Sequence, residues 1–171
     1  RERGLRVALY PFVMMDVARE NARPDPWSGA PSQPAHPWRG RITCDPAPGR
    51  PGSPDGTAAA DAQVTALFGT AAPGDFTRSG GRVSYAGPPE WSLRRQVLHY
   101  AHLCVAAGGV DAFVIGSEFV GLTRVRGAAG GYPAVAELAR LAADVRGVLG
   151  AGTRLTYAAD WTEYGAHVRE N

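Results

Sequence analysis

A short apolar run that ends abruptly in a carboxylate is the clearest pattern in the chain. Residues 110–115 are mostly β-branched or aromatic, which is typical of an interior strand covered on both faces. Gly116 and Ser117 end the run, and Glu118 follows directly. In α/β barrels, catalytic groups lie at the carboxyl ends of the strands. The pattern therefore predicts a strand that presents Glu118 at the edge of a sheet.

Two further strands and two amphipathic helices alternate with this strand. We expect strands over 5–11 and 153–159, and apolar residues recur at helical spacing over 91–107 and 133–149. The order strand, helix, strand, helix, strand predicts a parallel sheet. Neither strand-to-helix loop carries a Gly-x-Gly-x-x-Gly or Walker pattern, which disfavours a nucleotide-binding domain. The expected fold is therefore α/β, a partial (β/α)8 TIM-barrel-like domain of about three βα units.

The whole chain, 1–171, is interpreted as a fragment of one such domain, with 17–90 as a long loop-rich connection inside it. The chain starts at Arg1 rather than Met, and strand patterns lie close to both ends. Within the connection we expect a helix over 57–68, a short strand over 41–44 and a strand pair around 82–85.

Tryptophans in and beyond this connection are candidates for stacking against sugar rings. Trp27 and Trp38 lie among many prolines and glycines, and they argue against disorder there. Trp161 follows the third predicted strand. An equally good interpretation is that such side chains only anchor the loops on the body of the protein.

Composition excludes several classes of function. All 18 basic residues are arginine, the net charge is +2, and the arginines are scattered, so the basic stripe of a nucleic-acid binder is missing. No apolar run approaches the roughly 20 residues that span a bilayer, which argues against membrane insertion. Cys44 and Cys104 are expected to be free thiols. His99 and His102 have no second ligand pair, so neither a metal nor another cofactor is expected.

Other acidic residues follow the predicted strands as Glu118 does. Asp16 comes shortly after the first strand, and Asp160 and Glu163 come after the third. Because the carboxyl ends of parallel strands share one edge, these acids could line the same face as Glu118. The alternatives remain that Asp16 is a solvated loop acid and that Glu118 caps a short segment or pairs with an arginine.

Five stretches resemble the TIM-barrel-like domain of gene transfer agent and phage-tail host-specificity (baseplate hub) proteins. They are WRGRITC at 38–44, SPDGT at 53–57, LHYAHLC at 98–104, IGSE at 115–118 with GLT at 121–123, and YAADWTEY at 157–164. Together they cover nearly the whole chain. More distantly, IGSE and the start of YAADWTEY resemble β-mannanase-like glycoside hydrolase barrels.

The more distant resemblance implies a general acid/base role for Glu118 alone. Such enzymes carry their nucleophile glutamate after a much later strand, which this sequence does not contain. We therefore expect Glu118 and Asp160 to point into one cleft, with Asp160 as a positioning residue. Glu163, Trp161, Trp38, Trp27 and Asp16 are expected to bind substrate, and the chain alone is expected to be inactive on β-linked oligosaccharides.

The resemblance implies a component of a phage-tail-like particle, a gene transfer agent baseplate or host-specificity protein. Its barrel would engage or cleave a cell-surface glycan, with other tail or baseplate proteins as partners. Two alternatives are a catalytically inactive architectural tail domain and a stand-alone soluble glycosidase. Fold alone does not separate them.

Overall fold

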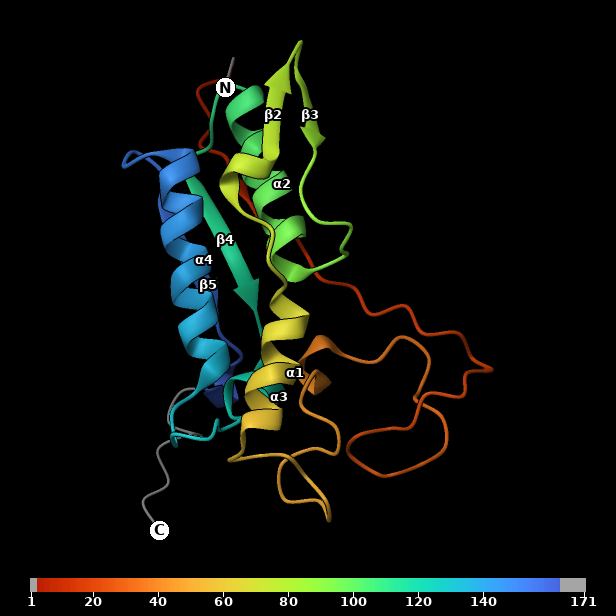
Figure 1. Cartoon of the computed structure of the whole chain (residues 1–171). Helices are drawn as coiled ribbons and strands as arrows, with labels where there is room; N and C mark the ends of the chain where they lie inside the picture. The colour runs from red at the N-terminus through yellow and green to blue at the C-terminus, as the bar shows by residue number, and fades with distance from the viewer. Residues whose placement is uncertain (1–2, 164–171) are drawn as a thin grey trace. The chain divides into compact units, whose positions relative to one another are not determined.

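Residues 3–163 are described by the structure, a computed structural model (Figure 1), and they contain a three-stranded sheet in the order β1–β4–β5. The strands are β1, Ala8–Leu9; β4, Ala112–Ser117; and β5, Arg154–Ala158. β1 runs parallel to β4, with Ala8 opposite Ala112. The parallel sheet with its helices confirms the predicted α/β fold. Within the described residues the sheet is not closed, which is consistent with a partial barrel.

The first strand is much shorter than the predicted range 5–11. The carboxylate of Asp111 accepts a hydrogen bond of 2.7 Å from the Val7 N–H, while the Val7 carbonyl accepts from the Asp111 N–H at 2.8 Å. A side chain thus takes part in the pairing where the strand was expected to begin. At the other end, Pro11 has no N–H to donate to a ladder. The regular pairing is limited to Ala8–Leu9.

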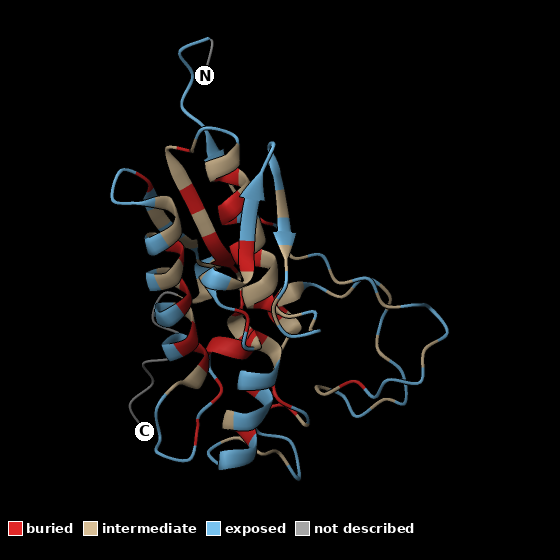
Figure 2. Cartoon of the chain, turned by 45° about the horizontal axis from the view of Figure 1, so that its top comes forward, coloured by how far each residue is buried: buried red, intermediate tan, exposed pale blue. Residues whose placement is uncertain are grey.

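The two predicted amphipathic helices are confirmed as α2, Leu93–Ala106, and α4, Pro133–Leu149. Ser92 caps α2 by accepting from the Arg95 N–H at 3.2 Å, and Gly108 and Gly109 follow the helix with positive φ. An ion pair between Arg94 and Asp144 joins the two helices. Buried positions, red in Figure 2, lie along β4 and on one side of α4. The free thiols expected at Cys44 and Cys104 are confirmed, and both are buried.

The long connection contains more regular structure than loops alone. Its helix is confirmed as α1, Ala58–Phe68, and its strand pair as the antiparallel hairpin β2, Phe76–Ser79, and β3, Arg82–Tyr85. Gly80 and Gly81 make the turn with φ of 55° and 75°, which suits glycine. The short 3-10 helices among residues 3–163 are η1, Arg39–Arg41; η2, Pro73–Asp75; and η3, Trp161–Glu163.

The strand predicted over 41–44 is wrong. This segment begins in η1 because the Arg41 N–H bonds to the Trp38 carbonyl at 2.9 Å and the Ile42 N–H to the Arg39 carbonyl at 3.0 Å. The Arg41 carbonyl accepts instead from the indole N–H of Trp27, at 2.8 Å. Local turns and a side chain therefore use the backbone groups that a ladder would need.

The contacts within the chain define two compact units. The first, called the sheet unit, holds the residues up to Pro11 together with Ala66–Gly116 and Glu137–Ala158. The second, called the loop unit, holds Phe12–Thr65, Ser117–Ala136 and the residues from Ala159 on. Tyr164, the last residue of the motif at 157–164, lies outside the described residues.

Candidate functional site

Glu118 follows β4 directly and has an unusual backbone conformation. Its φ is 52°, in the left-handed region that residues other than glycine rarely adopt. A non-glycine residue in this region costs on the order of 1–3 kcal/mol and persists where its surroundings hold it, typically at functional sites. The residue before it, Ser117, is buried. The predicted position of Glu118 at the end of a strand is therefore accompanied by local strain.

Two consecutive residues of the long connection hold the Glu118 side chain. The indole N–H of Trp38 donates to Oε2 of Glu118 at 2.9 Å, and Nη2 of Arg39 forms an ion pair with the same oxygen. Nε of Arg39 donates to Oγ of Ser117 at 2.8 Å. Indole and guanidinium groups are donors only, so Oε2 of Glu118 is an acceptor in this arrangement. The expected alternative of a pairing with an arginine is thus found, with Arg39 as the partner.

Aromatic faces lie next to this ion pair. The guanidinium carbon of Arg39 lies 4.0 Å from the centre of the Phe12 ring, in a cation–π contact. Phe12 is 46% exposed and Trp38 is 45% exposed. The site therefore combines a carboxylate, a guanidinium and two partly open aromatic rings.

A close backbone contact in the loop unit places η1 beside the residues that follow Glu118. The short helix α3, Val120–Thr123, follows Glu118 and contacts η1. A Cβ on Gly121 would lie 2.7 Å from the Gly40 carbonyl oxygen and 2.8 Å from that of Ile42. Only glycine fits there, so Gly121 lets Arg39 reach Glu118.

Asp160 and Glu163, the acids after β5, form a capped turn. Oδ1 of Asp160 accepts from the Thr162 N–H at 2.8 Å and from its hydroxyl at 2.5 Å. These two bonds hold the pKa of Asp160 below its ordinary value, against the smaller opposing effect of burial. Oε2 of Glu163 accepts from the Asp160 N–H at 2.6 Å, and the Thr123 hydroxyl donates to Oε1 at 3.2 Å. Asp160 and Glu163 are thus brought together, and Glu163 reaches α3.

The remaining candidate residues lie in different surroundings. Trp161 is 83% exposed, as a stacking platform requires. Trp27 donates its indole N–H to the Arg41 carbonyl, and its ring lies against Gly121, as an anchor does. Asp16 is well exposed and lies 3.4 Å from Nδ1 of His36. The roles predicted for these residues, and the shared cleft of Glu118 and Asp160, stay predictions.

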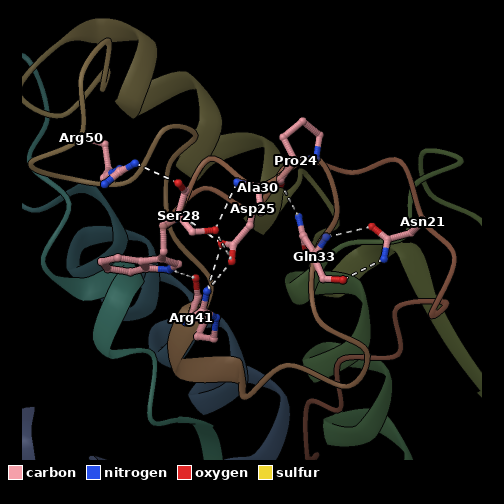
Figure 3. Close-up of polar contacts among 9 residues, drawn as sticks. Asn21, Pro24, Asp25, Ser28, Ala30, Gln33, Arg41 and Arg50 are labelled. Carbon is pink, nitrogen blue, oxygen red and sulfur yellow. Dashed lines mark hydrogen bonds and ion pairs between the residues drawn. The ribbon is translucent and has the colours of Figure 1, made fainter.

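A hydrogen-bonded network orders the loop that carries η1 (Figure 3). Nη2 of Arg41 donates to both carboxylate oxygens of the buried Asp25, at 3.0 and 2.8 Å. The backbone N–H of Trp27 and the hydroxyl of Ser28 also donate to the Asp25 carboxylate. Burial would raise the pKa of Asp25, but these bonds and the Arg41 charge together lower it. Figure 3 also shows Asn21 paired with Gln33, and Arg50 donating to the Ser28 carbonyl.

Sequence reasoning missed Arg39, Phe12 and the hydroxyl of Ser117 as members of the site. The signal that pointed to this region was the stretch at 38–44, whose second residue is Arg39. Arg39 and Ser117 lie 78 positions apart, so no local pattern pairs them.

No cluster of three or more metal-ligating side chains occurs among residues 3–163. In the same part of the chain, no helix is long and apolar enough to cross a membrane.

Residues 91–171 match the family model of the gene transfer agent (GTA) TIM-barrel-like domain. The matched range contains Glu118, Asp160, Trp161 and Glu163, and it starts after Trp38 and Arg39, so it covers less of the chain than the resemblance suggested. No curated protein matches the chain.

Proposed function

We propose, from the match of residues 91–171 to the family model of the gene transfer agent TIM-barrel-like domain, that the chain engages a cell-surface glycan as part of the particle's baseplate or host-specificity protein. The family match supports a domain related to the tail of a gene transfer agent. The glycan and the baseplate location go beyond the match.

The observation that carries the proposal is the arrangement around Glu118. A strained carboxylate after β4 is held by Trp38 and Arg39, and Phe12 and Trp38 leave part of each ring open. Sugar recognition uses aromatic faces for the ring and a few fixed polar groups for the hydroxyls. The two partly open rings beside the ion pair therefore support recognition of a sugar.

Binding is favoured over cleavage by the present arrangement of the acids. Glycosidases use two carboxyl groups about 5–5.5 Å or 6.5–9.5 Å apart, one of which donates a proton. Here Oε2 of Glu118 accepts two bonds, and Oδ1 of Asp160 accepts two bonds from its own turn. We expect the purified chain to show no hydrolysis of β-linked oligosaccharides; Glu118 keeps its acid/base role as a prediction for an intact barrel. The same observation favours an inactive architectural domain as the second candidate.

Binding to immobilised glycans tests the proposal. The purified chain is applied to a panel of neutral and uronic-acid-containing polysaccharides, and binding is measured by surface plasmon resonance. Trp38→Ala is expected to weaken binding about tenfold, since a stacked aromatic contributes on the order of 1 kcal/mol beyond its buried area.

Trp91→Ala serves as the matched control, because Trp91 is also exposed but belongs to the sheet unit. It is expected to leave binding unchanged. If no glycan of the panel binds, or if both variants behave alike, the glycan proposal is wrong and the architectural candidate takes its place.

A further inference from the structure

Arg39 is a charged side chain that is buried more deeply than the acid with which it pairs. Its side chain is 11% exposed, whereas that of Glu118 is 32% exposed. In an ordinary surface ion pair, both charged groups remain exposed to water. Removing a guanidinium from water is costly, so a position like this one requires a partner with negative charge.

The donors of Arg39 face two oxygens that come from two different residues. Nε bonds to the Ser117 hydroxyl, and Nη2 bonds to the Glu118 carboxylate. Nε and Nη2 lie on the same edge of the guanidinium, and this edge matches both oxygens of a single carboxylate in the bidentate geometry. A single carboxylate could supply both oxygens to the Nε–Nη2 edge of Arg39. In this structure Glu118 supplies one of them and Ser117 supplies the other.

We propose that Arg39 is the residue that recognises the carboxylate of an acidic sugar, and that Glu118 occupies its place until the glycan binds. This inference rests on the proposed glycan binding and names the class of glycan, one that contains uronic acids or other carboxylated sugars. The incoming carboxylate takes the Nε–Nη2 edge, where one of its oxygens replaces the Ser117 hydroxyl at Nε and the other replaces Glu118 at Nη2. The Glu118 side chain turns out toward solvent, to which it is already partly open.

The surroundings of Arg39 suit this exchange. The Phe12 ring lies under the guanidinium at 4.0 Å and fixes its plane. The nearby cation in the same loop, Arg41, is already neutralised by Asp25 through two hydrogen bonds. Once Glu118 turns away, the positive charge of Arg39 has lost its carboxylate partner, and the glycan carboxylate neutralises it. The partly exposed ring of Trp38 lies beside this position.

Native and carboxyl-reduced glycans form the matched probes for this inference. Mannuronan, polygalacturonate and hyaluronan are compared with the same polymers after reduction of each carboxylate to a primary alcohol, which keeps the linkages and removes the charge. The purified chain is expected to bind at least one native polymer at least about tenfold more tightly than its reduced form, and added salt should weaken that binding.

Three variants separate recognition from a structural role. Arg39→Gln should abolish the preference for the native polymer, while Arg39→Lys should keep part of it, because lysine retains the charge but not the bidentate edge. Glu118→Gln should tighten binding of the native polymer several-fold, because it removes the competing carboxylate while its amide oxygen still accepts from Trp38. Since Glu118→Gln is expected to gain affinity, a failure of the Arg39 variants to fold leaves the inference testable.

The outcomes distinguish this inference from the proposed function. Equal binding of native and reduced polymers, or binding of neutral glycans alone, overturns the role of Arg39 and leaves glycan binding intact. Weaker binding by Glu118→Gln also overturns it, because Glu118 would then contact the glycan itself. Binding of no glycan at all overturns both.

Discussion

At the scale of single residues, the pair of Arg39 and Glu118 lies between two well-studied extremes. Exposed ion pairs contribute about 0–1 kcal/mol, and breaking a buried pair costs about 3–5 kcal/mol. With side chains 11% and 32% exposed, this pair falls between them. The contacts from Arg39 and Trp38 offset the backbone strain at Glu118, which explains how a non-glycine residue persists there.

A double-mutant cycle measures this pair. Arg39→Met and Glu118→Gln, alone and together, are unfolded with urea, and we expect a coupling free energy of about 1–3 kcal/mol. The variant Arg124→Met, combined with Glu118→Gln, is the control, because Glu118 pairs with Arg39 rather than with the neighbouring Arg124. A coupling of Arg39 and Glu118 near zero would mean that the pair is not maintained in solution.

A second residue, His102 on α2, is predicted to make stability depend on pH. It is buried and stacks on Phe76 with ring centres 5.1 Å apart. Burial lowers the pKa of His102 below 6.5, and the charge of Arg78 lowers it further. The unfolded chain thus takes up a proton more readily than the folded one, so the folded state loses stability as the pH falls below about 6.5.

The variant His102→Leu removes this proton uptake. Its free energy of unfolding, relative to that of the unmodified chain, should rise steadily as the pH is lowered from 7 to 5. The measurement is urea unfolding at each pH. A difference that does not change with pH would contradict the assigned shift.

At the scale of elements, two glycines with opposite roles test the helix assignments. Gly147 is exposed inside α4, and a Cβ there would meet nothing within 4 Å. Gly147→Ala should therefore stabilise the protein by about 0.5–1 kcal/mol, because alanine loses less backbone entropy in a helix. Thermal unfolding followed by circular dichroism measures the change, and a lower melting temperature would contradict the position of Gly147 inside α4.

Gly69, directly after α1, should respond in the opposite way. Its φ is 75°, and a Cβ would lie 2.3 Å from Cβ of Ser92. Gly150, directly after α4, has a similar φ of 78°, but a Cβ there would meet nothing within 4 Å. Gly69→Ala should therefore destabilise the protein by more than Gly150→Ala does. The strain of a positive φ alone costs about 1 kcal/mol, so a larger loss at Gly69 reports the contact with Ser92. Equal losses at the two positions would contradict that contact.

At the scale of the whole molecule, hydrogen-bonded carboxylates predict sensitivity to acid. Burial raises the pKa of Glu90, but bonds from the Ser92 hydroxyl, the Thr70 and Ala71 N–H groups and the Thr70 hydroxyl outweigh it and lower the pKa from 4.5 to about 2. The pKa values of Asp25 and Asp160 are lowered as well. Stability from these groups is complete above their unfolded pKa values and is lost as the pH falls through the folded ones.

Glu90→Gln reports this loss at one position. At pH 7 it should lower the free energy of unfolding by about 1–2 kcal/mol, because charged acceptors bind more strongly than neutral ones. The loss should shrink between pH 4.5 and about 2, where the unmodified side chain also becomes neutral in the unfolded and then the folded state. A loss that stays constant over this range would show that the charge of Glu90 has no part in it.

The sequence by itself determined the elements whose signals are local. The sequence predicted helices α1, α2 and α4 and the strand that leads to Glu118. Their signals are the spacing of apolar residues, the capping residues and the glycines that follow the helices, and all of these act within a few residues. The parallel arrangement followed from the alternation of these elements. The position of Glu118 at the end of a strand followed from the same local pattern.

Only the tertiary structure decided which groups meet. The segment 41–44 looked like a strand, but the Trp27 indole and local turns take up its backbone groups. The sequence placed Asp160 after a strand but gave no sign that Thr162 donates two hydrogen bonds to its carboxylate. Arg39 meets Glu118 because Gly121 permits close packing of η1 on α3. Contacts between residues so far apart depend on how the chain packs, and periodicity along the sequence carries no record of them.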